Sequence, residues 1–361
     1  MHLEGLSPSA TTYSFCLSSC TNSMDIMKGV TLHGEAIKKG LEKEDSVGDA
    51  LLEFYANCSP LADLENFFYN LCERDVTKWN RIIQGYVHHG LIEKACSCLE
   101  HMYTEGVLPD VVSWNSLVLG FIEAGQSVKS LELFLLMQAH SLPPDRVMLV
   151  STLKACGELA ALELGKRIHA QGCQLMDYEM CNTLIDMYGK CGSMSLAQVV
   201  FDAMTSKNLV TWNALLAGYA RHGAGTSVFH YFDKMNECCV EPDEVTFLSV
   251  LNACRHAGLL SRAQEWFEAT AMKSRFSLNV KHYTCMIDHY GRAGHVNEVM
   301  VMVDKMPVHS DLVLWEMVLG SCHEQGNAGV GRRAFNYLAR LDESQSTAYL
   351  LLSNMYANAS G

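Results

Sequence analysis

The stretch LVTWNALLAGYARHGAGTSVFHYFDKMNECCVEPD, residues 209–243, decides the fold of this chain. Its Trp-Asn dipeptide recurs at Trp79-Asn80 and Trp114-Asn115, and each time it opens a 35-residue unit that closes on Pro-Asp. The two other units of this kind span 76–110 and 111–145. Recurrence at a fixed period indicates an array of units that pack only on their neighbours, and such arrays are above all binding surfaces.

Within each unit the local pattern is that of a helical hairpin. Apolar residues recur at helical spacing on both sides of a central glycine. In 209–243 these residues are Leu215, Leu216, Tyr219, Val228, Phe232 and Met235. The glycines that would form the turns are Gly90, Gly125, Gly192, Gly223, Gly258 and Gly294. Since alternating strand patterns are absent, we predict an all-α fold, an α-solenoid of helix-turn-helix units.

The charge of the chain argues against a nucleic-acid partner. Lys and Arg number 27 against 40 Asp and Glu, a formal net charge of −13, whereas phosphate contacts usually require a basic surface. A solenoid can still bind RNA if basic residues line its groove and acidic residues cover the opposite face. The longest apolar stretches, such as Leu133 to Met137, are too short to cross a bilayer.

The cysteines and tryptophans point to packing. None of the 15 cysteines forms a CxxC pair, and the spacing favours free thiols in a reducing compartment over disulfides. Four cysteines share the eleventh position of their units, as a small buried residue would: Cys20, Cys156, Cys254 and Cys322. A tryptophan beside a groove-facing asparagine is turned about 100° away on a helix, so Trp79, Trp114 and Trp212 are predicted to pack between units rather than stack on bases.

The motifs resemble those of a known family. Trp-Asn-x-Leu, Met-x-x-x-x-x-x-Pro-Asp, the LGKRIHA of 164–170 and the IDMYGKCGS of 185–193 are similar to the P, L and S repeats of plant pentatricopeptide repeat (PPR) proteins. The order of the repeats resembles that of the PLS subclass. This resemblance implies a right-handed α-solenoid superhelix of helix-turn-helix PPR repeats.

The resemblance divides the whole chain into repeats. We expect a partial P repeat at 1–9, P repeats at 76–110, 111–145 and 209–243, L repeats at 10–44, 146–177 (short) and 244–279, and S repeats at 45–75, 178–208 and 280–311. Residues 312–345 resemble the first E motif that follows the last repeat, and 346–361 a truncated second E motif. Because both ends fall inside repeats, we expect a fragment or a truncated gene model.

PPR proteins read single-stranded RNA at one base per repeat, through the fifth and the last residue of each repeat. An Asn amide at the fifth position offers a donor and an acceptor to a base edge. The resemblance assigns uracil to Asn80 with Asp110, Asn115 with Asp145 and Asn213 with Asp243, a pyrimidine to Asn182 with Asn208, and guanine to Thr284 with Asp311. It assigns no base to Asp49 with Asp75.

The second residue of a repeat is expected to pack against base faces, which selects Val112, Val210 and Val245. L repeats carry Ser14, Val150 and Leu248 at the fifth position and are expected to read weakly. The predicted target is any-U-U-any-pyrimidine-U-any-G, 5′ to 3′.

PLS proteins with E regions specify cytidine-to-uridine editing sites in organellar transcripts. The resemblance therefore implies a site-recognition factor in a mitochondrion or chloroplast, although no transit peptide is visible. A deaminase or another editosome protein would act in trans. His33-Gly34-Glu35 matches the HxE of a zinc deaminase but lies inside an L repeat with no CxxC after it. We therefore predict no enzyme and no cofactor. Two alternatives stay open, which are an RNA binder for stabilisation, processing or splicing, and a protein-interaction scaffold.

Overall fold

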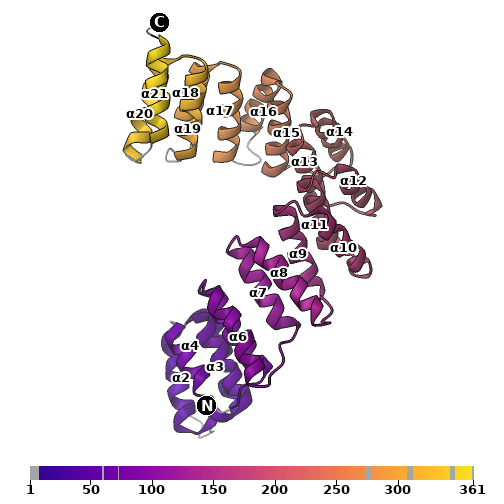
Figure 1. Ribbon diagram of the computed structural model, residues 1–361, viewed down its shortest axis with the longest axis vertical. Coiled ribbons are helices and arrows are strands. Elements are labelled where there is room, and N and C mark those ends of the chain that lie inside the picture. The colour runs from indigo at the N-terminus through magenta and orange to yellow at the C-terminus, as the bar shows by residue number, and fades with distance from the viewer. Residues whose placement is uncertain are drawn as a thin grey trace. The chain divides into compact units, whose positions relative to one another are not determined.

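The computed structural model describes residues 8–58, 61–71, 73–273, 278–306, 312–341 and 346–359. Every element in these ranges is a helix (Figure 1), which confirms the all-α prediction for the described residues. The chain divides into two compact halves, 1–180 and 181–361, and each is treated by itself. No helix within the described ranges has the length and apolar character that a membrane span requires.

The amino-terminal half consists of helix pairs joined by short turns. Its helices are α1 (Ala10–Ser23), α2 (Ile26–Lys38), α3 (Asp45–Cys58), α4 (Leu61–Tyr69), α5 (Val76–His88), α6 (Ile92–Thr104), α7 (Val111–Glu123), α8 (Ser127–Ala139), α9 (Arg146–Glu158) and α10 (Leu162–Gln171). Short 3-10 helices follow two of the pairs, η2 (Leu41–Lys43) and η3 (Gly172–Leu175).

Helix α11 (Tyr178–Lys190) contains the point at which the halves divide. The carboxy-terminal half continues with α12 (Met194–Ala203), α13 (Leu209–Arg221), α14 (Gly225–Glu237), α15 (Glu244–His256), α16 (Leu260–Lys273), α17 (Val280–Arg292), α18 (Val296–Lys305), α19 (Leu312–Glu324), α20 (Ala328–Leu341) and α21 (Ser346–Ala359).

In each half the helices form two layers. The first helix of one repeat packs on the first helix of the next, as α5 does on α7 and α13 on α15. The second helix packs on the first helix of its own repeat and of the following one, as α6 does on α5 and α7. We call these the first-helix layer and the second-helix layer.

The closing residue of a repeat begins the next helix. Asp110 is the N-cap of α7, and its carboxylate accepts a hydrogen bond from the Ser113 backbone N–H. Asp243 does the same for α15 through Thr246. An N-cap of this kind stabilises a helix by about 1 kcal/mol. The turn between paired helices passes through a left-handed glycine, with φ of 69° at Gly125 and 68° at Gly223.

The predicted packing residues are buried. Trp79 and Trp114 are each 1% exposed and Trp212 is 2% exposed, which confirms packing rather than base stacking. The Trp212 ring meets Phe201 edge to face, with ring centroids 4.9 Å apart. Cys20, Cys156, Cys254 and Cys322 are also buried, and Cys20, Cys254 and Cys322 are free thiols.

One buried histidine makes the stability of the carboxy-terminal half depend on pH. His289 in α17 is 3% exposed, and neither ring nitrogen has a hydrogen-bond partner within the part of the chain described. Burial lowers the pKa of His289. As the pH falls below about 6.5 the unfolded chain takes up this proton before the folded chain does, so stability is lost.

When the pH falls from 7.5 to 5.5, we expect the free energy of unfolding of His289→Leu to decrease less than that of the wild type. The difference between the two decreases should be at most about 1.4 kcal/mol per pH unit. Urea unfolding at both pH values measures this difference. Because other histidines titrate in both proteins, the comparison isolates His289. Parallel losses in the two proteins would contradict the prediction.

Candidate nucleic-acid interface

The structure brings Asn80 and Asp110 together although they belong to opposite ends of their repeat. The Asn80 amide Nδ2 donates to Asp110 Oδ1 at 3.0 Å. Ser113, the third residue of the following repeat, donates its hydroxyl proton to Asn80 Oδ1 at 2.5 Å and accepts from the Asp110 backbone N–H at 3.2 Å. The two predicted reading residues are therefore joined to each other and to a third side chain.

The repeat 209–243 has the same arrangement. Asn213 Nδ2 donates to Asp243 Oδ1 at 3.0 Å, and Thr246 Oγ1 donates to Asn213 Oδ1 at 2.5 Å. Burial raises the pKa of Asp243, but hydrogen bonds from Thr246, Asn213 and the Val245 backbone outweigh it and leave the pKa lowered. The Asp243 carboxylate is thus held in its charged, accepting form.

The predicted repeat 178–208 contains a variant of this network without a carboxylate. Thr211 Oγ1 lies 2.7 Å from Asn182 Oδ1 and 2.9 Å from Asn208 Oδ1. The hydroxyl therefore links the two predicted reading residues of this repeat.

Asn115 differs from the other three asparagines. Its Nδ2 donates to Asp145 Oδ2 at 2.8 Å. The third residue of the next repeat is Met148, which has no hydroxyl, and Asn115 Oδ1 is buried with no partner in the described part of the chain.

The remaining predicted pairs are not brought together in this way. Thr284 donates its hydroxyl proton to the Val280 carbonyl of its own helix at 2.9 Å, and its predicted partner Asp311 lies outside the described residues. Asp49 Oδ1 is buried without a partner among the described atoms, and burial raises the pKa of Asp49.

The predicted base-packing and base-reading residues differ in exposure. Val112, Val210 and Val245 are 46%, 59% and 47% exposed. Asn80 and Asn213 are only 6% and 8% exposed. The first-helix layer thus presents apolar side chains next to amides of which only a small part reaches solvent.

Charge is distributed unevenly among the helices of the two layers. On α13, α15 and α17 basic residues outnumber acidic ones by four to two, and the same holds on α5, α7 and α9. On α14, α16 and α18 six acidic residues face four basic ones, and on α6, α8 and α10 the numbers are equal. These six first helices are therefore more basic than the second helices that follow them, whereas α3, α11 and α19 of the same layer together carry seven acidic residues and one basic residue.

A cavity of about 490 Å³ opens among α15, α17 and α19, all in the first-helix layer. Thr284, Lys281 and Arg292 line it. Arg255 pairs with Asp288 at 2.7 Å, and Arg292 Nε contacts the same carboxylate at 3.1 Å. One carboxylate between two guanidinium groups leaves a net positive charge, which suits a phosphate. This cluster could not be predicted from sequence spacing, because Arg255 lies on α15 whereas Asp288 and Arg292 lie on α17.

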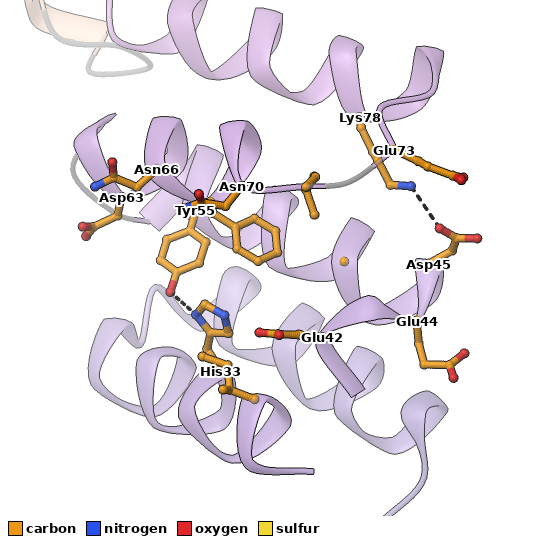
Figure 2. Close-up of a pocket in the computed structure, with 14 residues that line it drawn as sticks. His33, Glu42, Glu44, Asp45, Tyr55, Asp63, Asn66, Asn70, Glu73 and Lys78 are labelled. Atoms are coloured by element: carbon orange, nitrogen blue, oxygen red, sulfur yellow. Dashed lines mark hydrogen bonds and ion pairs between the residues drawn. The ribbon is translucent and has the colours of Figure 1, made fainter. Parts of the chain in front are cut away.

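A second cavity, of about 610 Å³, lies in the amino-terminal half among α2, α3 and α4 (Figure 2). Lys78 reaches Asp45 at 2.9 Å at one end of it. The other charged residues of its lining are acidic, and these are Glu42, Glu44, Asp63 and Glu73. This mainly acidic lining repels phosphate.

The HxE tripeptide lies beside this second cavity, and its two side chains have separate partners. His33 Nδ1 lies 2.5 Å from the Tyr55 hydroxyl, and this contact is the dashed line between the two residues in Figure 2. Glu35 accepts a hydrogen bond from the Tyr13 hydroxyl at 3.1 Å. Both contacts join neighbouring helices, His33 of α2 to Tyr55 of α3 and Glu35 of α2 to Tyr13 of α1.

Comparison with known proteins decides the family. Models of the PPR repeat match residues 78–107, 112–142, 179–209, 245–269 and 281–310, and a model of the PPR repeat family matches 207–256. The chain belongs to the PPR repeat family. A pentatricopeptide repeat-containing protein of Arabidopsis thaliana is 35% identical over 97% of this PPR chain and 66% of its own length. Another from the same plant, named as mitochondrial, is 33% identical over 99% of the chain and 53% of its own length.

The fold of this PPR chain is also that of solved relatives. The crystal structure of the pentatricopeptide repeat protein PPR10 from maize superposes with a TM-score of 0.51 and 17% identity, covering 100% of this chain and 68% of PPR10. The α-solenoid prediction is thereby confirmed. The PPR chain spans between about half and two thirds of the length of these curated relatives.

Proposed function

We propose that this PPR chain binds single-stranded RNA sequence-specifically through its first-helix layer. The observation that carries the proposal is the pairing of fifth and last residues, Asn80 with Asp110 and Asn213 with Asp243, beside exposed second-position valines. An amide held at a defined place can recognise a base edge, and an exposed valine can cover a base face. PPR10 has been crystallised with an 18-nucleotide psaJ RNA element, which supports RNA as the ligand class.

Each pair has a specific base in this proposal. Uracil lies opposite Asn80 with Asp110, Asn115 with Asp145 and Asn213 with Asp243, a pyrimidine opposite Asn182 with Asn208, and guanine opposite Thr284 with Asp311. Val112, Val210 and Val245 pack on the bases. Arg255, Lys281 and Arg292 attract the backbone of the strand.

The biological role that fits this surface is recognition of cytidine-to-uridine editing sites in an organelle, with the deaminase supplied in trans. This role rests on the P-L-S order of the repeats and the E-like segment after them. The mitochondrial names of two relatives support an organellar location. RNA stabilisation, processing or splicing would use the same surface.

The test uses two RNAs that carry UU or GG opposite repeats 76–110 and 111–145, with binding measured across a salt series. We expect at least about tenfold preference for UU, because each good base contact contributes roughly 1–3 kcal/mol. Replacing Asn80 and Asn115 by alanine should abolish this preference.

Three results would point elsewhere. Equal binding of both RNAs with a steep dependence on salt would show phosphate attraction alone. No binding would favour a protein-interaction scaffold, which the charge of −13 also suits. A UU preference that survives the double replacement would rule out these amides as the reading groups.

A further inference from the structure

A side chain outside the predicted reading pairs recurs in contact with them. Ser113 contacts Asn80 at 2.5 Å, Thr211 contacts Asn182 at 2.7 Å, and Thr246 contacts Asn213 at 2.5 Å. Each of these hydroxyls belongs to the third residue of the following repeat. Ser113 and Thr246 are fully buried at 0% exposure, so water does not compete for their protons.

The number of hydrogen bonds that an asparagine amide can form shows what this contact does to it. A side-chain amide has two N–H donors and two lone pairs on its oxygen. In Asn80 one donor is bound to Asp110 and one lone pair to Ser113. One N–H and one lone pair remain for a ligand, and two separate contacts fix both the direction and the plane of the group.

In Asn115 only the direction is fixed. Its Nδ2 contacts Asp145 at 2.8 Å, and its oxygen has no partner within the described ranges because Met148 stands at the third position. A single hydrogen bond tolerates tilting and rotation of the amide about the contact. The chain therefore contains both kinds of asparagine: Asn80, whose amide is held by two hydrogen bonds, and Asn115, whose amide is held by one.

At two further junctions the third residue carries no hydroxyl. Lys78 is the third residue of the repeat after the one that carries the acidic Asp49. Burial raises the pKa of Asp49, and the charge of Lys78 acts against this rise. Met180 follows the apolar Val150. The hydroxyl at the third position is therefore a property of particular junctions, as Met148 after Asn115 also shows.

We infer that the third residue of the following repeat is a positioning residue, which holds the reading asparagine so that it distinguishes uracil from cytosine. This inference rests on the proposed RNA-binding function. Uracil presents O4 as an acceptor beside the N3–H donor. Cytosine presents the N4 amino donor beside the N3 acceptor. The donor and acceptor positions of uracil and cytosine are thus interchanged. An amide that can tilt can adapt to both bases and discriminates poorly between them, whereas an amide held at both its nitrogen and its oxygen matches only one of the two bases.

The first test needs no variant. Binding is measured for the full chain with RNAs in which a single uridine is replaced by cytidine, opposite repeat 76–110 in one RNA and opposite 111–145 in another. We expect the U-over-C preference opposite Asn80 to exceed that opposite Asn115 by about three- to tenfold, the effect of one hydrogen bond. Equal preferences at the two positions would overturn the inference.

The second test alters the positioning residues. Ser113→Ala should reduce the U-over-C preference opposite repeat 76–110 to the level found opposite 111–145, and Ser113→Thr should keep it. The preference opposite repeat 209–243 is the internal control, since a general loss of stability would move all positions together. In the converse variant, Met148→Thr, the preference opposite 111–145 should rise.

The outcomes distinguish failure of the RNA-binding function from failure of the positioning role. If the wild type shows no uracil preference at any position, the RNA-reading function itself fails. If the wild type prefers uracil and Ser113→Ala retains the full preference opposite 76–110, the reading function stands and the positioning role is wrong.

Discussion

Replacing Trp212 by alanine is expected to lower the free energy of unfolding of the carboxy-terminal half by about 3–5 kcal/mol, the usual cost of removing a fully buried tryptophan. Trp212 is 2% exposed and its ring meets Phe201 edge to face. In a solenoid each repeat depends on its neighbours, so the loss should spread to the adjacent repeats. Urea unfolding followed by circular dichroism measures it.

Val210→Ala is the matched control, because Val210 lies two residues earlier in the same helix and is 59% exposed. A surface substitution of this kind changes stability by about 0.5 kcal/mol or less. If Trp212→Ala lost no more stability than Val210→Ala, the tryptophan would not be a packing residue and a role on the RNA side would have to be reconsidered.

Replacing Gly189 by leucine is expected to destabilise the same half by about 1–3 kcal/mol, since a new side chain would overpack a close helix contact. A Cβ on Gly189 would stand 3.2 Å from the Gly218 Cα of helix α13. This neighbour is backbone and cannot rotate away. The helices α11 and α13 must therefore separate, and the shift in the urea midpoint reports the cost.

Gly320→Ala, in the same half of the chain, is expected to raise the free energy of unfolding instead of lowering it. Gly320 lies in helix α19, where a Cβ would meet nothing within 4 Å. Alanine is favoured over glycine inside a helix by roughly 0.5–1 kcal/mol, so stability should rise slightly. Loss of stability in both variants to the same extent would refute a specific contact between Gly189 and Gly218.

Much of the fold could be predicted from the sequence because the signals are local and repeated. The spacing of apolar residues predicts the helices, and the central glycines indeed have positive φ, as at Gly125 and Gly223. The burial of Trp79 and Trp114 follows from their place on a helix. Local geometry alone determines these features, and the repetition makes each of them visible several times.

The structural surroundings of the candidate site could be predicted only in part. That Asn80 faces Asp110 was expected from the family resemblance, but its contact with Ser113 was not. The Asp110-x-x-Ser113 spacing is a recognisable capping pattern, and it could have pointed to the hydroxyl. Its second contact depends on how one repeat stacks on the next. The arginine cluster around Asp288 likewise joins side chains of two helices that sequence spacing does not relate.

The contact between Asn80 and Ser113 has a consequence for building new arrays from these repeats. A chimera cut at the ends of the repeats, between Asp110 and Val111, takes Asn80 from one parent and Ser113 from the other. A cut placed immediately before Trp114 keeps Asn80, Asp110 and Ser113 together. We therefore expect arrays assembled from segments that each begin at a tryptophan to retain the base preference of their parents. Arrays cut at the ends of the repeats should change the preference of a reading asparagine wherever the new third residue is a methionine in place of a serine or threonine, or the reverse.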